Sequence, residues 1–225
     1  MRIFHGHEPP VTAYYQDHKS YKCSRNGIIG LVLGKVVFKN IVIASTKNVG
    51  LSFVNIANAG KWENRVEGAI FVGTSNLMGG STHRGLIGPH SDLWLVSDAR
   101  FYNFPEGTGA ISQCMKCESN KDNAARTQTF EKLHFDDATV VKRVFFKEPD
   151  KGINFDLDGT LTELGPNSWS TSRWGHNEQE ECTINEERYD GIICPDSVTV
   201  RRVMFFSPNG SIKGKKMYIW QYDDA

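Results

Sequence analysis

The sequence predicts an all-β chain folded as a right-handed parallel β-helix, a coil in which each turn, or rung, contributes several short strands. Apolar runs rich in Val, Ile and Phe recur along the chain, and the larger ones often return every ~25–35 residues, as in solenoids. Glycines interrupt these runs, which favours short strands over helices. Long amphipathic helical windows are missing. We therefore expect inward Val, Ile, Leu and Phe side chains to stack between rungs, with irregular disulfide-bearing loops outside.

The runs divide the chain into three parts. Residues 1–24 are polar and predict a surface arm or an incomplete rung, residues 25–207 predict the β-helix, and residues 208–225 predict an edge segment or the start of a further rung. The main runs begin at Lys35, Arg65, Leu93, Thr129, Thr139 and Val198. A β-sandwich would also contain many short strands, but it favours tight two-residue hairpins at regular spacing. Few such turns precede Asp158, so the coil is preferred.

Charge and hydropathy argue against several classes of function. The 225 residues contain 26 Lys and Arg against 26 Asp and Glu, so no basic surplus exists to neutralise a nucleic acid. No apolar run approaches the ~20 residues of a membrane span, and the first residues lack a signal-peptide core. The 21 glycines and scattered β-type runs are typical of extracellular segments. We expect a fragment of a longer protein that uses no cofactor and binds a protein or glycan.

Five cysteines are present, so one, which we take as Cys23, has no partner within the segment. Cys114 and Cys117 could form a zinc half-site, a redox dithiol or a local disulfide. Zinc would need a second ligand pair, and a redox role would need a thioredoxin-like context, so the disulfide is favoured. A bridge between Cys182 and Cys194 would close a short polar loop and contribute about 3 kcal/mol. Two disulfides would imply an oxidising compartment.

The string DLDGTLT at residues 156–162 has two interpretations. A strand ending in DxDGT is typical of haloacid-dehalogenase-like phosphatases, where Asp156 would attack phosphorus and Asp158 would serve as acid/base beside Mg²⁺. Alternatively, Asp-Gly marks a strand, tight turn and strand without chemistry. The phosphatase needs several βα units after the motif, and only about 65 residues remain. The preceding strand also contains Lys151 and Asn154, unlike a strand buried on both faces. We therefore favour the turn.

One polar stretch combines two tryptophans with cationic groups. Trp169 and Trp174 occur there with Arg173 and His176. Exposed tryptophans beside an arginine could stack a sugar or anchor a partner. The alternative, which we favour, is that one or both pack over the side of the coil as loop anchors.

Weaker candidates lie on either side of this stretch. Arg201 and Arg202 alternate with valines, so at least one would face outward and could pair with a uronic acid or with a nearby glutamate. Asp156 and Asp158 are weak metal candidates, because two acids alone do not supply the six to eight oxygens that Ca²⁺ prefers. Asn209 begins an Asn-Gly-Ser sequence, an acceptor for N-glycosylation in a secreted chain.

Four longer strings stand out: residues 85–104, ISQCMKC at residues 111–117, residues 155–169 and residues 181–206. They closely resemble the parallel β-helix region of fibrocystin and fibrocystin-like proteins, and the resemblance extends from about residue 30 to residue 206. It implies a large secreted or single-pass cell-surface protein with immunoglobulin-like and β-helix modules, often associated with cilia, in which the DLDGT string is a rung-and-turn element.

The first expectation is therefore a non-enzymatic extracellular scaffold or receptor segment that presents loops to protein or glycan partners. The related cell-surface hyaluronidase group shares the module, so carbohydrate binding or cleavage is the second expectation, with no catalytic residue carried over.

Overall fold

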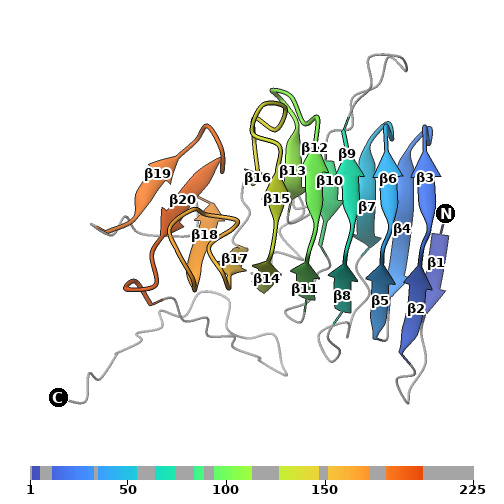
Figure 1. Cartoon of the computed structure of the whole chain (residues 1–225), viewed down its shortest axis with the longest axis horizontal. Helices are drawn as coiled ribbons and strands as arrows, with labels where there is room; N and C mark the ends of the chain where they lie inside the picture. Colours follow the sequence, from blue (N-terminus) through green and yellow to red (C-terminus); the bar gives the residue numbers. More distant parts are fainter. Residues whose placement is uncertain are drawn as a thin grey trace, which may run out of the picture.

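Every regular element in the computed structural model of the protein is a β strand (Figure 1). The structure describes residues 2–5, 12–32, 35–54, 64–73, 84–88, 94–112, 127–146, 152–172 and 181–199. Within these ranges there is no helix, and so none that is long and apolar enough to cross a membrane. The predicted all-β class is confirmed.

The strands of the described ranges belong to three sheets, here called A, B and C. Sheet A contains, in spatial order, β1 (Arg2–His5), β4 (Asn26–Val32), β7 (Val49–Val54), β10 (Arg84–Ile87), β13 (Gly109–Ser112) and β16 (Val144–Phe145). Sheet B contains β2 (Ala13–Gln16), β5 (Val36–Lys39), β8 (Asn64–Glu67), β11 (Trp94–Ser97), β14 (Thr127–Glu131), β17 (Ile153–Asp156), β18 (Ser168–Ser172), β20 (Gly191–Cys194) and β19 (Thr183–Asn185). Sheet C contains β3 (Lys19–Tyr21), β6 (Val42–Ala44), β9 (Ile70–Val72), β12 (Arg100–Tyr102) and β15 (His134–Phe135).

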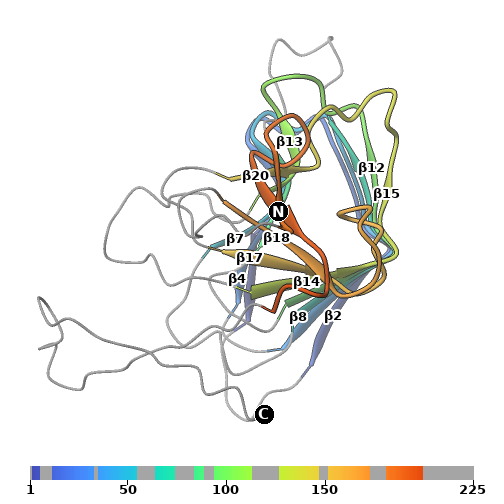
Figure 2. The same ribbon diagram turned by 90° about the vertical axis from the view of Figure 1, so that its left-hand side faces the viewer.

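The chain visits sheets B, C and A in rotation from β2 to β16, and one visit to all three is called a circuit below. Each strand from β1 to β14 pairs in parallel with the strand three positions later, as β2 pairs with β5 and β5 with β8. Figure 2, turned by 90° from Figure 1, shows the sheets enclosing the core on three sides. The parallel sheets expected from the sequence are therefore present.

A single left-handed residue makes the corner between sheets B and C in each circuit. Asp17, Asn40, Gly68, Asp98 and Lys132 occupy this position, with φ between 51° and 66°. A left-handed residue bends the chain sharply, and Gly, Asn and Asp tolerate this conformation best. The corner N–H groups of the first four residues donate to carbonyl groups of the next circuit at 2.8–3.2 Å. The corner therefore turns the chain and also continues the pairing between circuits.

The inner face of sheet C forms the aromatic part of the core. Register places Ser20, Ile43, Phe71, Phe101 and Phe135 in one column across the five strands. The Phe71 and Phe101 ring centroids lie 5.2 Å apart, and those of Phe101 and Phe135 lie 5.1 Å apart. Stacked cross-strand pairs of this kind stabilise neighbouring strands beyond simple burial. The column thus holds successive circuits together from the inside.

Parallel pairing ends at β17, because β18 and β20 join sheet B in antiparallel orientation. Loops from this end return over the core, and they bury Leu161 (0% exposed) and Tyr189 (1%) in the main hydrophobic cluster. The segment between β17 and β18 spans residues 157–167, so the predicted turn at Asp158 is a long hairpin loop rather than a tight turn. Covering the last circuit needs more chain than a two-residue turn supplies.

Three other segments differ from what the sequence predicts for them: the N-terminal segment and the apolar runs that begin at Thr139 and Val198. Residues 2–21 supply β1, β2 and β3, one strand for each sheet. In the run that begins at Thr139, only β16 is a strand, because Thr139 and Val140 donate to the Asp136 carbonyl and form a turn. Val198 and Thr199 are not in a strand, and the rest of that run lies outside the described residues.

Replacement of Phe101 by Ala should lower the free energy of unfolding by about 3–5 kcal/mol, because it leaves a cavity between two stacked rings. The matched control is Tyr102→Ala in the same strand, where the side chain faces outward; we expect a much smaller loss. Urea denaturation followed by circular dichroism measures both. Equal losses in the two variants would contradict the central position of Phe101 in the core.

Candidate binding surfaces

The DLDGT loop caps the last corner of the stack. At the four earlier corners the backbone N–H of the left-handed residue donates to a carbonyl of the next circuit. At the last corner the backbone N–H of Lys132 donates instead to the Asp158 carboxylate, at 2.7 Å. The next N–H, of Leu133, donates to the Thr160 hydroxyl at 2.9 Å. Thr160 also donates its N–H and hydroxyl to Asp158, at 3.1 and 2.7 Å. Side chains of the loop therefore replace the carbonyl groups that a further circuit would provide.

Asp156 holds the same loop from inside. Its buried carboxylate accepts hydrogen bonds from the N–H of Gly159 at 3.1 Å and from the N–H and hydroxyl of Thr162 at 2.7 and 2.9 Å. These bonds engage both carboxylate oxygens, and together they fold the loop over the end of the core. The loop geometry is therefore that of a structural cap.

The pKa values of the two carboxyls shift in opposite directions. Burial raises the pKa of Asp156, although hydrogen bonds from Thr162 oppose this shift. For Asp158 partial burial acts upward, but hydrogen bonds from Thr160 and Lys132 outweigh it and lower the pKa. Opposed shifts can mark an acid–base pair, yet here burial accounts for the raised pKa of Asp156, and backbone and hydroxyl donors account for the lowered pKa of Asp158. No group of three His, Cys, Asp or Glu side chains in the described ranges could hold a metal ion.

A buried arginine joins the turn after β15 to the DLDGT loop, residues 157–167, which is called the capping loop below. Arg143 is 3% exposed; it donates to the Leu161 carbonyl at 3.0 Å and pairs with Asp137 at 3.0 Å and with Glu163. Its guanidinium carbon lies 4.8 Å from the centre of the Phe135 ring. The partly exposed Arg188 contacts the same two carboxylates. A buried cation requires such partners. The cluster is therefore accounted for by its structural position, where it closes the end of the stack.

Tyr189 completes this cap. Its hydroxyl donates to the Leu161 carbonyl at 2.7 Å. Burial raises the pKa of Tyr189 to about 12, against the lowering effect of Arg143. The neutral phenol therefore stabilises the folded state.

The free energy of unfolding should fall by about 2–3 kcal/mol as the pH rises from about 10 to about 12, because one pKa unit corresponds to about 1.4 kcal/mol. The folded-state pKa of Tyr189 lies above the ordinary value of 10.0, so its contribution is complete below pH 10 and is lost as the pH approaches 12. Denaturant titrations at a series of alkaline pH values measure the effect. Tyr189→Phe removes the titrating group, and an unchanged alkaline slope in this variant would contradict the assignment.

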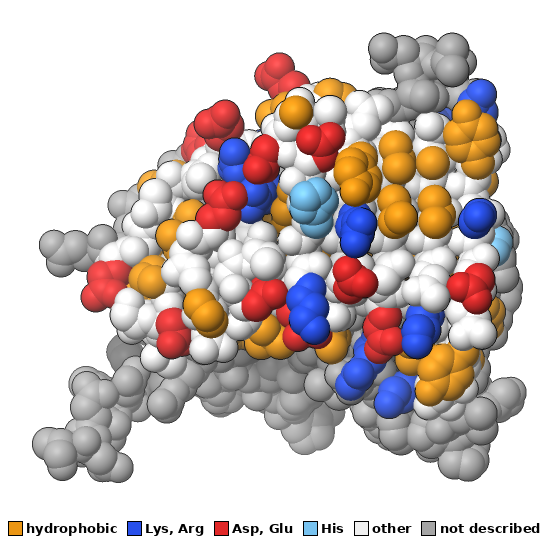
Figure 3. Space-filling model, viewed as in Figure 1, with side chains coloured by type: hydrophobic (Ala, Val, Ile, Leu, Met, Phe, Trp, Pro, Cys, Tyr) orange, Lys and Arg blue, Asp and Glu red, His pale blue; other side chains and the backbone are white. Residues whose placement is uncertain are grey.

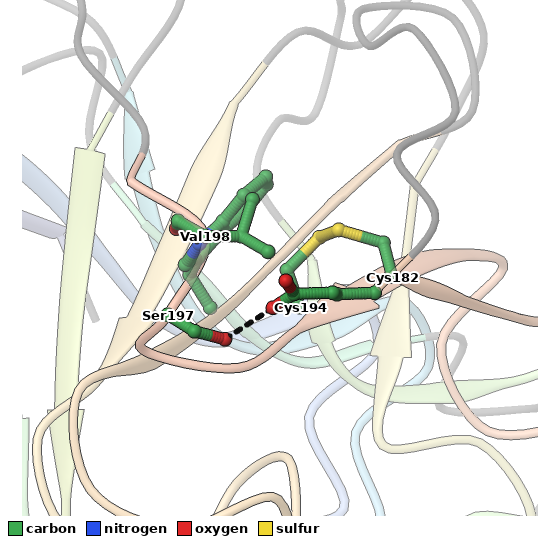
Figure 4. The surroundings of a disulfide bond; sticks show 6 residues. Cys182, Cys194, Ser197 and Val198 are labelled. Carbon is green, nitrogen blue, oxygen red and sulfur yellow. Dashed lines mark hydrogen bonds between the residues drawn. A yellow bond between two sulfur atoms is a disulfide. The ribbon is translucent and has the colours of Figure 1, made fainter.

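The predicted bridge between Cys182 and Cys194 is confirmed, with a Cα–Cα distance of 4.4 Å. Figure 4 shows Ser197 and Val198 beside it. It joins the start of β19 to the end of β20, where Cys194 is fully buried. Cys23 is a free thiol whose sulfur lies 3.1 Å from the Ser20 hydroxyl. The expected pair Cys114 and Cys117 lies outside the described residues.

Replacement of both Cys182 and Cys194 by Ala should lower the free energy of unfolding by about 2–3 kcal/mol, because the short closed loop regains conformational freedom in the unfolded chain. Cys23→Ala is the matched control and should change stability by no more than about 0.5 kcal/mol. Denaturation with and without a reductant measures both. A double variant as stable as the oxidised parent would show that the bridge does not support this end.

Trp169 does not lie in an exposed loop, where it could have stacked a sugar or anchored a partner. It lies in β18 and is 1% exposed, and its indole N–H donates to the Val198 carbonyl at 2.7 Å. It therefore anchors the segment after β20, in agreement with the favoured alternative. The other residues predicted for ligand binding or glycosylation lie outside the described residues: Arg173, Trp174, His176, Arg201, Arg202 and Asn209.

The outer face of sheet C carries an apolar array, visible as regular orange rows in Figure 3. Its first row aligns Tyr21, Ala44, Val72 and Tyr102 across four strands, and its second row aligns Val42 with Ile70. We call these six residues the sheet C patch. Tyr21 is 61% exposed, and the other five are partly exposed.

Cationic groups border the sheet C patch. Lys19 and Arg100 end the second row, His134 follows Arg100 in register, and the Lys22 ammonium lies 5.0 Å from the Tyr21 ring centre. The sequence contains a signal for this surface: residues 41–44 and 69–72 are continuously apolar, whereas a strand with one solvent-exposed face would alternate. The outer residues of both runs form the patch.

A pocket of about 410 Å³ lies on the outer face of sheet B near its antiparallel end. Residues from β14, β17 and β18, from the capping loop and from the segment after β20 line it: Thr129, Phe155, Leu157, Asn167, Trp169, Asp196, Val198 and Thr199. Of these eight residues, the sequence singled out only Trp169 as a binding residue. The others come from four separate segments, which are brought together by the parallel pairing of β14 with β17 and by the antiparallel pairing of β17 with β18 and of β18 with β20.

Comparison with protein families, curated proteins and solved structures found no match to the chain.

Proposed function

We propose that the chain is a non-enzymatic scaffold or receptor-like segment of a larger extracellular or cell-surface protein, built as a right-handed parallel β-helix. Support for this architecture comes from the rotation through sheets B, C and A and from parallel pairing between strands three apart. Each circuit contacts mainly its neighbours, which makes a stiff body that is suited to presenting a surface. The proposed relatives are the fibrocystin-like proteins, on the strength of the sequence resemblance.

The observation that carries the proposal is the sheet C patch. Soluble proteins seldom leave an ordered apolar array on a flat sheet without a partner for it. Here six aligned side chains provide apolar contact, and two of them are tyrosines, which are enriched at protein interfaces. Lys19, Lys22 and Arg100 at the border favour a partner with acidic groups around an apolar centre. A protein partner fits this combination best, because the floor between the tyrosines is aliphatic.

An extracellular location is supported by the Cys182–Cys194 disulfide, since structural disulfides persist in oxidising compartments. The phosphatase alternative is weaker, because the hydrogen bonds of Asp156 fold its own loop and Asp158 caps a corner. A carbohydrate-active module of the hyaluronidase type is the alternative that the sequence resemblance implies, and it is not carried by the pocket on sheet B, whose described lining holds a carboxylate and no cation.

The double variant Ile70→Lys/Val72→Lys should lose at least tenfold in affinity for a protein partner, because it places two charges in the apolar array. Leu95→Lys is the matched control, since Leu95 is also a partly exposed residue of a parallel strand but lies on sheet B. Saturable binding of the labelled chain to intact epithelial cells measures the effect.

Protease treatment of the cells should abolish this binding, and glycosidase treatment should leave it in place. Binding that persists in the double variant would overturn the assignment of the patch. Binding that is lost on glycosidase treatment alone would favour the carbohydrate-active alternative.

A further inference from the structure

We propose that the pocket on sheet B, here called the sheet B pocket, binds an uncharged sugar unit of a glycan. This inference goes beyond the scaffold function and does not depend on the sheet C patch, which lies on a different sheet. It rests on the chemistry of the pocket lining, on the fixed geometry of its wall and on its volume.

The floor of the pocket is apolar and partly aromatic. Register aligns Thr129, Phe155 and Trp169 on neighbouring strands β14, β17 and β18, so these residues share the outer face of sheet B. Phe155 is partly exposed, Leu157 is 41% exposed, and Val198 closes the floor from the other side. An aromatic ring flanked by aliphatic groups offers a surface for the C–H face of a pyranose ring.

The rim supplies polar groups that suit hydroxyls. Thr129, Asn167, Asp196 and Thr199 bring two hydroxyls, one amide and one carboxylate to the lining. In the described part of the chain no hydrogen bond engages these four side chains. Each can therefore donate to or accept from a ligand without breaking an internal bond, which is how a few polar groups orient a ligand above an apolar floor.

The wall that carries Asp196 and Thr199 is fixed at several points. The disulfide holds Cys194 directly before it, and the Trp169 indole holds the Val198 carbonyl. The Ser197 hydroxyl donates to Glu181 at 2.5 Å, and the Val198 N–H donates to the Pro195 carbonyl at 3.1 Å. A wall that is already ordered loses little entropy on binding, so even a weak polar ligand can be held.

Charge and size decide which sugar fits. Among the described residues that line the pocket, Asp196 is the one ionisable side chain, and its negative charge disfavours uronic acids and sulfated sugars. A neutral sugar instead donates hydroxyls to this carboxylate, and bonds to a charged acceptor are among the stronger ones. The volume of about 410 Å³ is at the lower end of ligand pockets, ~300–1,000 Å³, and suits a short saccharide rather than a long polymer.

The test measures binding of neutral oligosaccharides ending in glucose, galactose, mannose or N-acetylglucosamine, with glucuronate-containing and sulfated oligosaccharides in parallel. Saturation-transfer NMR detects contact with the sugar C–H groups, and calorimetry gives Kd. We expect at least one neutral saccharide to bind in the millimolar range or tighter and charged ones to bind at least tenfold more weakly. Asp196→Asn and Phe155→Leu should each weaken binding about tenfold or more.

Asp98→Asn is the matched control for Asp196→Asn, because it removes an exposed carboxylate at a corner where Asn is tolerated. Thr199→Ala, also at an exposed position, tests the rim without touching the floor, in case Phe155→Leu alters folding. Binding of no neutral saccharide, stronger binding of uronates, preference for lysine or arginine peptides, or full affinity in Asp196→Asn and Thr199→Ala would each overturn the proposal. Protein-partner binding through the sheet C patch would be unaffected by any of these results.

Discussion

Parallel backbone pairing between strands three apart is the constraint on which the rest of the structure depends. Parallel strands cannot be joined by a tight hairpin, so the chain must travel through two other sheets before it returns. The single left-handed corner keeps the B-to-C part of this route short, and its N–H adds one more bond between circuits. The stacked rings of Phe71, Phe101 and Phe135 follow from the same register.

At the end of the stack there is no further circuit to pair with. A last parallel circuit would therefore expose both its core and its corner N–H groups. The DLDGT loop provides acceptors for the corner, and Arg143 and Tyr189 close the core behind it. A motif that resembles a phosphatase nucleophile thus acts as a cap, and its acids are present because they accept backbone hydrogen bonds. The antiparallel strands that follow also create the sheet B pocket.

The sequence was sufficient to predict the all-β fold class and one disulfide bond. Recurrent β-branched runs predicted strands and parallel sheets, and the spacing of Cys182 and Cys194 predicted their bridge. The corner positions were overlooked, although Asp17, Asn40, Gly68 and Asp98 share the residue types that a left-handed turn favours. The number of residues between them varies from circuit to circuit, so no fixed period reveals them.

The candidate surfaces could not be predicted in the same way. Whether Ile70 faces in or out depends on register, and a shift of one residue moves a side chain to the other face. The pocket is harder still to predict. Parallel pairing places Thr129 beside Phe155, and the change to antiparallel pairing then brings the segments of Asn167 and Asp196 to the same place. Sequence patterns report local periodicity, whereas both surfaces are products of distant strands lying side by side.

The β17–β20 end is fastened in three ways: by the Cys182–Cys194 bridge, by the ion pairs of the buried Arg143 and by the capping loop. One wall of the sheet B pocket follows the bridge directly in the chain. Where circuits depend on their neighbours, opening of one exposes the next. Local opening of this end must therefore break these fastenings before the pocket loses its shape, so the residues that close the stack also preserve the geometry of the pocket.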